Sequence, residues 1–358
     1  MTWPAYIDDP GPSNPGTLYV SRGRVPQYFE RHGYSGQAWR VGNEYTTYCP
    51  NRSRSYKSTA RLRFKSLEDF HDLMERCQIL RLRPPISYAD LFFQQQRLPC
   101  LPRYTWTGSF RRFTFGGWES AFHQGEYRGP VYQYDLNSAY RWAGSIGLPD
   151  IAKLERTNRF NDPVGIYIVV LKENSLPYAP RAGIHCVTSE ERDVYDVRPE
   201  KLILGIRANG ETHAVAEAFE TLEKKWPERY IKPMARAYWG KFNTRLGPKQ
   251  ISWKRGQSEH QQSNFFFNPI WSAFITSRVK IRLAMWRAVA LHVYVDSILT
   301  TKPIPEGEDL GSFRLLDSDT DGCYIHSSTR FKFGPNPPAR WSKTTTLGER
   351  NGDFERKT

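Results

Sequence analysis

The sequence predicts an α+β fold, and three features of its second half support that prediction. Short apolar runs of a strand's length recur there; the clearest are residues 131–135, 163–171 and 201–206. Two helical patterns then follow at 212–226 and 229–244. A longer helix begins at Asn268-Pro269, with proline at its first position, and is expected to run to Ala290. A strand at 292–296 comes next, so these elements together predict a sheet with flanking helices.

The N-terminal third is expected to contain both strands and helices. Its first 20 residues are rich in Pro, Gly and Ser, which predicts a loose arm. Tyr- and Thr-rich runs between residues 38 and 65 predict strands. Ser66 is expected to cap a helix with Leu73 on its apolar face, and a second short helix is expected around residues 88–95.

The charge of the chain favours a polyanionic partner. Lys and Arg number 51 against 37 Asp and Glu, which gives a net charge of +14 and a pI near 9.5. Each phosphate that such a protein neutralises releases a condensed counterion. Aromatic residues make up 14% of the chain and add surfaces on which bases can stack. Composition therefore favours nucleic acid, with a membrane surface or simple solubility as the alternatives.

The sequence also indicates a soluble intracellular protein. The N-terminus has no basic segment followed by an apolar stretch, so no signal peptide is expected. The longest apolar run, Val164–Leu171, is too short to span a bilayer, which predicts no membrane partner. The five cysteines lie far apart without a C-x-x-C pair, as is typical of a reducing compartment.

Two aspartates stand at the ends of short predicted strands, in Val131-Tyr-Gln-Tyr-Asp135 and in His292-Val-Tyr-Val-Asp296. Phosphoryl transfer to a nucleotide uses two divalent cations about 3.5–4 Å apart. Mg²⁺ takes few carboxylates and keeps water and phosphate oxygens as its other ligands. If the two strands are neighbours in a sheet, Asp135 and Asp296 supply that minimal set.

Two basic residues, Lys232 and Arg236, stand four positions apart on a predicted helix and so share one face. There they would meet the triphosphate charge that two metal ions leave unneutralised. A lone strand-end aspartate is more often a turn residue or a helix cap, and a lone lysine is usually solvated. The order and spacing of the three segments favour the functional interpretation.

These segments resemble the motifs of a family B DNA polymerase, closest to the protein-primed branch of phages, linear plasmids and adenoviruses. The family's D-x-x-S-L-Y-P is matched by Asp135-Leu-Asn-Ser-Ala-Tyr-Arg141, and its K-x-x-x-N-S-x-Y-G by Lys232-Pro-Met-Ala-Arg-Ala-Tyr-Trp-Gly240. Its Y-x-D-T-D-S is matched by His292-Val-Tyr-Val-Asp-Ser297. A preceding Y-x-G-G is matched by Phe113-Thr-Phe-Gly-Gly117, and the resemblance covers roughly residues 105–333.

The resemblance implies a polymerase palm, in which an antiparallel sheet has flanking helices, with short two-helix fingers and little or no thumb. The implied regions begin with an N-terminal α+β region that contacts template (residues 1–104) and a first part of the palm (105–211), which contains the first motif at 131–140. The fingers (212–250), a second part of the palm (251–335) and a flexible tail (336–358) follow.

The resemblance also implies roles for individual residues. Asp135 and Asp296 would hold two Mg²⁺ ions, with Mn²⁺ as the alternative, and the Leu136 carbonyl would complete one coordination shell. Ser138 and Tyr140 would lie at the incoming nucleotide, with Tyr140 under its sugar, so that dNTPs are the expected substrates. The remaining implied contacts are with the triphosphate (Lys232, Arg236) and with DNA (Gly116, Gly117, Lys241).

Several positions depart from the family's pattern. Tyr294 replaces the first aspartate of D-T-D, Arg236-Ala237 replaces Asn-Ser, and Trp239 replaces tyrosine. A literal D-T-D occurs in Asp317–Gly322, but it lacks the helix and strand that precede the third motif and is expected to form a turn. The N-terminal region is too short for the family's exonuclease domain, which predicts no proofreading.

The function that follows is template-directed addition of dNTPs to a 3′-OH on a primer–template, by two-metal nucleotidyl transfer. With so little thumb, the enzyme is expected to be distributive unless a terminal protein or processivity partner holds it on DNA. A primase-like or protein-priming enzyme is one alternative. A catalytically inactive palm-fold protein that binds nucleic acid is the other; Tyr294 supports it, whereas the retained Asp135, Lys232 and Asp296 oppose it. A phage, virus or mobile-element origin, in a host cell's cytoplasm, is also implied.

Overall fold

The computed structural model describes residues 116–242 apart from residue 180, residues 266–334, and shorter stretches between residues 20 and 110. The chain divides into two compact units, one formed by Met1–Leu98 with Ala218–Tyr238 and the other by Pro99–Glu217 with Trp239–Thr358. Several expectations lie outside the described residues: the loose arm, the Ser66 cap, the Phe113–Phe115 part of the glycine motif, and the tail.

The first unit contains a four-stranded sheet and helix α3 (Tyr88–Gln95). The sheet has the strand order of the chain, β1 (Val20–Arg22), β2 (Gln37–Val41), β3 (Glu44–Tyr48) and β4 (Arg63–Phe64). The strands predicted between residues 38 and 65 are therefore confirmed, and so is the second short helix.

Side chains of helix α3 pack in the core of this unit. The ring of Phe92 lies 5.0 Å from that of Phe219 and 5.2 Å from that of Tyr238, between ring centroids. The Trp226 indole N–H donates to the Gln95 side-chain oxygen at 2.7 Å. These contacts join α3 to the helix pair α7 (Ala214–Glu223) and α8 (Glu228–Phe242). Both helices were expected. Helix α7 is shorter than predicted at both ends, whereas α8 begins at Glu228, one residue earlier than predicted, and is described as far as Phe242.

An aspartate ties the same parts of the first unit together. Asp72 accepts hydrogen bonds from Arg76, Arg229 and Tyr230, so it joins a helical turn of the N-terminal region to α8. Partial burial acts to raise the pKa of Asp72, but these three hydrogen bonds outweigh it and lower the pKa below its ordinary value. The N-terminal region therefore supports the α7–α8 pair.

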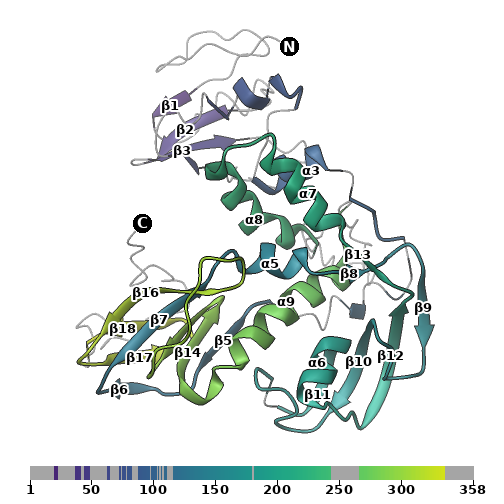
Figure 1. The fold of residues 1–358 in the computed structure, drawn as a ribbon, viewed down its shortest axis with the longest axis vertical. Coiled ribbons are helices and arrows are strands. Elements are labelled where there is room, and N and C mark those ends of the chain that lie inside the picture. Colours follow the sequence, from purple (N-terminus) through teal and green to yellow (C-terminus); the bar gives the residue numbers. More distant parts are fainter. Residues whose placement is uncertain are drawn as a thin grey trace, which may run out of the picture. The chain divides into compact units, whose positions relative to one another are not determined.

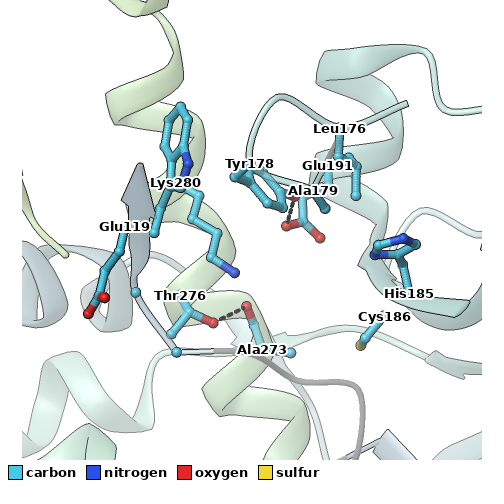
Figure 2. Close-up of a pocket in the computed structure, with 13 residues that line it drawn as sticks. Glu119, Leu176, Tyr178, Ala179, His185, Cys186, Glu191, Ala273, Thr276 and Lys280 are labelled. Carbon is cyan, nitrogen blue, oxygen red and sulfur yellow. Dashed lines mark hydrogen bonds between the residues drawn. The ribbon is translucent and has the colours of Figure 1, made fainter. Parts of the chain in front are cut away.

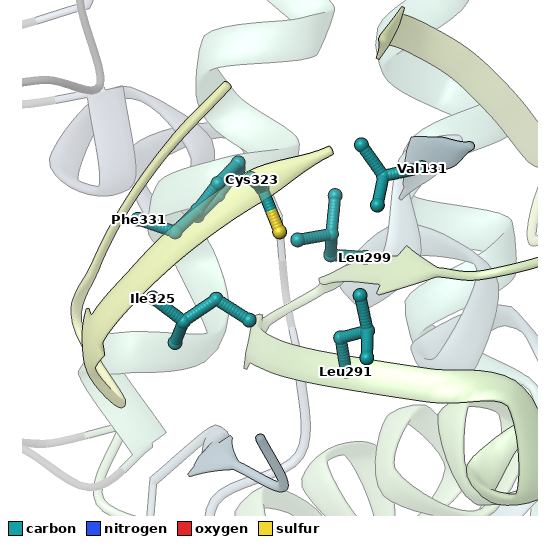
Figure 3. Close-up of a cluster of buried hydrophobic side chains, with 6 residues drawn as sticks. All are labelled: Val131, Leu291, Leu299, Cys323, Ile325 and Phe331. Carbon is teal, nitrogen blue, oxygen red and sulfur yellow. The ribbon is translucent and has the colours of Figure 1, made fainter. Parts of the chain in front are cut away.

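The second unit contains a five-stranded antiparallel sheet with the strand order β16-β7-β15-β14-β5 (Figure 1). Its strands are β5 (Trp118–Ala121), β7 (Val131–Leu136), β14 (Ala290–Val295), β15 (Ser297–Thr300) and β16 (Phe313–Asp319). A three-stranded sheet is formed by β6 (Gly125–Tyr127), β17 (Cys323–Ser327) and β18 (Arg330–Phe333). Buried apolar side chains fill the space between these two sheets (Figure 3): Val131, Leu291, Leu299, Cys323, Ile325 and Phe331.

A four-stranded antiparallel sheet with the order β11-β10-β12-β9 completes the second unit. Its strands are β9 (Leu154–Thr157), β10 (Gly165–Leu171), β11 (Gly183–Thr188) and β12 (Lys201–Ala208), and α6 (Ser189–Tyr195) follows β11. Helix α9 (Pro269–Ala284) lies between this sheet and the five-stranded sheet (Figure 1). The α+β prediction is confirmed, with sheets that are largely antiparallel.

The predicted extent of α9 was wrong at its C-terminal end. The helix ends at Ala284, a 3₁₀ turn occupies Arg287–Val289, and Ala290 already belongs to β14. Ala290 pairs with Thr300 of β15. The apolar spacing continues through this segment, but sheet pairing with β15 overrides it, as tertiary contacts often override local pattern.

The predicted turn at Asp317–Gly322 was also partly wrong. Asp317 and Asp319 belong to β16 and pair with Gln133 and Val131 of β7, so the turn is confined to the residues that follow. There Asp319 accepts from the Asp321 and Gly322 amides. Among the described residues, no helix is both long and apolar enough to cross a membrane.

A buried histidine makes the stability of the second unit depend on pH. His292 in β14 is 1% exposed, and its Nε2–H donates to the Ser328 carbonyl at 3.0 Å. Burial lowers the pKa of His292 from 6.5 to about 4. Between these values the unfolded chain binds a proton that the folded chain does not, so stability is expected to fall as pH decreases from 6.5 to 4. The loss should approach about 3 kcal/mol.

Urea denaturation at pH 7, 5.5 and 4.5 measures this loss. His292→Gln keeps a donor for Ser328 but cannot be protonated in this range, so its free energy of unfolding should fall less than that of the wild type. Equal losses in both proteins would show that other groups cause the pH dependence.

Candidate active site

The five-stranded sheet brings Asp135 and Asp296 together. Asp135 in β7 pairs with Ser297 of β15, the residue directly after Asp296. Asp296 lies in the tight turn between β14 and β15, and its carbonyl accepts a hydrogen bond from the Leu136 amide at 3.0 Å. Both aspartates are partly exposed, whereas Leu136 is buried. The structure therefore places the two predicted carboxylates at the same end of the sheet, one at the end of β7 and the other in the turn that leads into β15, the neighbour of β7.

Residues directly opposite one another in a sheet present their side chains on the same face. The row through Asp135 runs across all five strands and contains Arg314, Asp135, Ser297, Tyr294 and Glu119. Tyr294 therefore shares a face with Asp135, on the strand where the family resemblance would put another aspartate. Within the parts of the chain that the structure describes, no three Asp, Glu, His or Cys side chains converge as a metal site. Two carboxylates and nearby backbone carbonyls are hard oxygen donors of the kind that Mg²⁺ accepts.

The turn that carries Asp296 is conformationally strained. Val295 has a φ of 62°, in the left-handed region that a β-branched residue rarely adopts. Ser138, directly before the helix α5 (Ala139–Ser145), also has a positive φ of 49°. Such conformations cost about 1–3 kcal/mol each and concentrate at functional sites. Both strained residues lie within three positions of one of the two aspartates.

Gly117 is required beside this turn. A Cβ atom at Gly117 would lie 2.9 Å from both Cα and Cγ1 of Val295, closer than real contacts allow. At Gly116 a Cβ would meet nothing within 4 Å. The predicted reason for the glycine pair was close approach to DNA, whereas the structure gives Gly117 a reason within the protein, namely its packing on the turn that holds Asp296.

The two glycines allow a matched test of this packing. Gly117→Ala is expected to lower the free energy of unfolding by about 1–3 kcal/mol, because the methyl group has no space beside the Val295 backbone. Gly116→Ala should change it by less than about 0.5 kcal/mol. Urea denaturation of both variants measures the difference. Equal effects of the two substitutions would contradict a special role for Gly117.

Helix α5, which follows Asp135 in the chain, carries the buried Tyr140. This tyrosine is 6% exposed and stacks on Trp239, with ring centroids 4.2 Å apart and ring planes 13° apart. Burial raises the pKa of Tyr140, and the negative charges of Asp296 and Asp135 raise it further. Both carboxylates are therefore near enough to the phenol for their charges to act on it. The Trp239 contact was not predicted, although the sequence departs from the family's tyrosine at that position.

The predicted basic residues occupy different parts of the chain. Lys232 and Arg236 are both exposed on α8, in the first compact unit. Their spacing puts them on one helix face, as predicted. Lys241 is in the last turn of α8, in the second unit. The predicted contacts of these three residues with triphosphate or DNA stay predictions.

A cavity of about 240 Å³ opens beside Gly116 and Gly117 (Figure 2). Lys280 of α9 is 7% exposed and points its ammonium group into this cavity, with Nζ 4.8 Å from the centre of the Tyr178 ring. Glu191 on the opposite wall accepts hydrogen bonds from Tyr178 and from the Thr188 amide. Burial lowers the pKa of Lys280 and raises that of Glu191, although each charge partly offsets the effect on the other.

This cavity was missed because residues 172–200 were not assigned to any element. One signal was available: Thr188 followed by Glu191 is a capping box, which marks a helix start. Both reciprocal hydrogen bonds of that box are present at the start of α6.

The fold is similar to that of solved structures of Phi29 DNA polymerase. Two of these structures match with a TM-score of 0.56 and 10% identity, and each match covers 88% of this chain and 78% of the polymerase chain. One is the post-translocation binary complex with primer–template DNA, and the other is the complex with single-stranded DNA. The orthorhombic crystal form matches with a TM-score of 0.49 and 13% identity, and this chain spans only 54% of that chain. No protein-family model matches the sequence, and no curated protein matches it. The likeness is therefore one of fold, and it is distant.

Proposed function

We propose that this protein is a template-directed DNA polymerase that adds dNTPs to a 3′-OH by two-metal nucleotidyl transfer. One observation carries the proposal: Asp135 at the end of β7 and Asp296 in the turn before β15 meet at one end of an antiparallel sheet, and both charges act on the buried Tyr140. The distant fold likeness to a DNA polymerase that has been solved with primer–template DNA supports it. In this proposal the five-stranded sheet with α9 is the palm, and α7 with α8 forms short fingers.

The two aspartates and the Leu136 carbonyl would hold the metal ions, Mg²⁺ or Mn²⁺. When bound, the ions would lower the pKa of the primer 3′-OH and neutralise charge on the leaving pyrophosphate. Tyr140 and Trp239 would form an aromatic wall against the sugar and base of the nucleotide, with Ser138 at the start of the same helix. Lys232 and Arg236 would meet the triphosphate from the fingers.

The distribution of charge indicates which parts would grip DNA. Residues 116–242 and 266–334 together carry 25 basic and 24 acidic residues, so they are nearly neutral. Residues 1–115 carry 17 basic against 9 acidic residues. Non-specific affinity for the DNA backbone rises with the number of phosphates neutralised. The N-terminal region would thus supply most of the affinity, and Lys280 beside Gly116 would add a phosphate contact near the site.

Primer extension tests the proposal. The protein is given a labelled primer–template, dNTPs and Mg²⁺ or Mn²⁺, next to reactions without primer and without template. Template-dependent extension of the primer supports the polymerase, whereas products in the lane without primer favour the primase-like alternative. DNA binding in a gel-shift assay without extension by either metal would refute the enzyme and leave the nucleic-acid-binding palm, which Tyr294 favours.

A further inference from the structure

We propose that Arg278 is a positioning residue that fixes helix α5, and with it Tyr140, and that Glu190 couples this helix to the four-stranded sheet. The inference rests on the proposed function for its catalytic consequence, but not for its geometry. Arg278 lies on α9, α5 carries Tyr140, and Glu190 lies in the first turn of α6.

Arg278 is nearly completely buried, at 4% exposure, and all three of its guanidinium nitrogens donate hydrogen bonds. Nη1 donates to the Ala143 carbonyl at 2.8 Å and to the Ile146 carbonyl at 3.0 Å. Nη2 donates to the Gly147 carbonyl at 2.5 Å. One side chain thus binds three carbonyls at the C-terminal end of α5.

Helix α5 depends on such an external contact. It has only seven residues, begins after a strained Ser138, and has no side-chain hydrogen bond at its N-terminal cap. Helices this short are unstable alone, and their last carbonyls have no partners within the helix. A cation at the C-terminal end also interacts favourably with the helix dipole. Arg278 supplies both the donors and the charge.

The other side of the guanidinium binds Glu190. Nε lies 2.9 Å from each Glu190 carboxylate oxygen, and Nη2 donates to Oε1 at 2.5 Å. A planar, bidentate pair of this kind fixes orientation, which a lysine cannot do with its single ammonium group. Beside it, the hydroxyls of Thr188 and Ser277 are 2.8 Å apart and join α6 to α9 again. A movement of α6 would therefore reach α5 through Arg278.

If the Arg278–Glu190 salt bridge were purely structural, its loss would lower the free energy of unfolding without a specific effect on nucleotide binding. A positioning residue should instead change the exchange of α5 amides and the KM for dNTP, while the KM for primer–template stays constant. It should also weaken discrimination against rNTPs, because Tyr140 would no longer be held in place.

Glu190→Gln is the decisive variant, because Glu190 is partly exposed and glutamine keeps its size. Arg278→Lys is the second variant. The control is Arg207→Gln, which breaks the exposed Arg207–Glu155 pair in the four-stranded sheet, away from α5. Hydrogen–deuterium exchange of residues 139–148 and steady-state kinetics with dNTP and rNTP are measured for all three.

Glu190→Gln and Arg278→Lys are expected to speed exchange in residues 139–148 about tenfold and to raise KM for dNTP about ten- to a hundredfold, while Arg207→Gln changes neither. Unchanged exchange and unchanged KM in Glu190→Gln would overturn the inference, and so would a loss confined to kcat. If the wild type lacks polymerase activity, the proposed function fails, but faster exchange in residues 139–148 would still establish the anchoring of α5.

Discussion

Replacement of either Asp135 or Asp296 by asparagine is expected to reduce nucleotide addition by about 10³-fold or more. Asp135 lies at the end of β7 and Asp296 in the turn before the neighbouring strand β15, and the Leu136–Asp296 backbone hydrogen bond holds the end of β7 to this turn. Asparagine keeps the size of the side chain but removes the charge that binds a divalent cation. Single-turnover primer extension with Mg²⁺ measures the loss.

Asp317→Asn and Asp319→Asn are the matched controls. These aspartates lie in β16 of the same sheet, and Asp319 accepts hydrogen bonds from two amides of its own turn. Their substitution should leave extension within about twofold. DNA binding should be unchanged in all four variants. If Asp319→Asn were as inactive as Asp296→Asn, the literal D-T-D sequence at residues 319–321 would be the metal site in place of Asp296.

The strands that carry the candidate site could be predicted because their signals are local. The strands that end at Asp135 and Asp296 are short apolar runs, and both form as expected. The motif order predicted that these two strands would be neighbours, but β15 lies between β7 and β14 in the sheet. The β14–β15 turn still brings Asp296 to the end of β7, where its carbonyl accepts the Leu136 amide. Helix α3 was predicted correctly over Tyr88–Gln95 because its signal is also local.

What the sequence did not predict depends on contacts between distant segments. The end of α9 was missed because pairing of Ala290 with Thr300 decides it. The role of Gly117 depends on Val295, which is 178 positions away in the chain, and no local pattern links the two. Arg278 appears in the sequence as one more charge on a helix, yet it is buried by partners from α5 and α6.

Tyr294, which stands where the family's third motif has its first aspartate, fits the predicted sheet but removes that carboxylate. It pairs with Ser297 and Glu119 and so fits the sheet without distortion of the pairing. If the proposed site binds metal ions, it does so with one fewer carboxylate than the family's third motif would supply. Its affinity for them is then expected to be lower, since affinity for a divalent cation rises with the number of charged ligands.

Tyr140→Val is expected to raise the use of rNTPs relative to dNTPs by about ten- to a hundredfold. The Tyr140 ring is buried, stacked on Trp239 and close to both aspartates, so a nucleotide held by metal ions there would place its sugar against the ring. Forcing a 2′-hydroxyl into a filled site costs about 1–3 kcal/mol, which corresponds to that range of discrimination. Removal of the ring removes the cost.

Tyr140→Phe is the control that separates the ring from its hydroxyl, because phenylalanine keeps the stack on Trp239. It should discriminate against rNTPs as the wild type does. Competition between dCTP and CTP opposite a template guanine, in single-nucleotide extension, measures both variants. If Tyr140→Val loses overall rate but keeps its discrimination, the ring does not face the sugar, and Tyr140 supports α5 as a core residue instead. If Tyr140→Phe discriminates as poorly as Tyr140→Val, the phenol oxygen rather than the ring excludes the ribose.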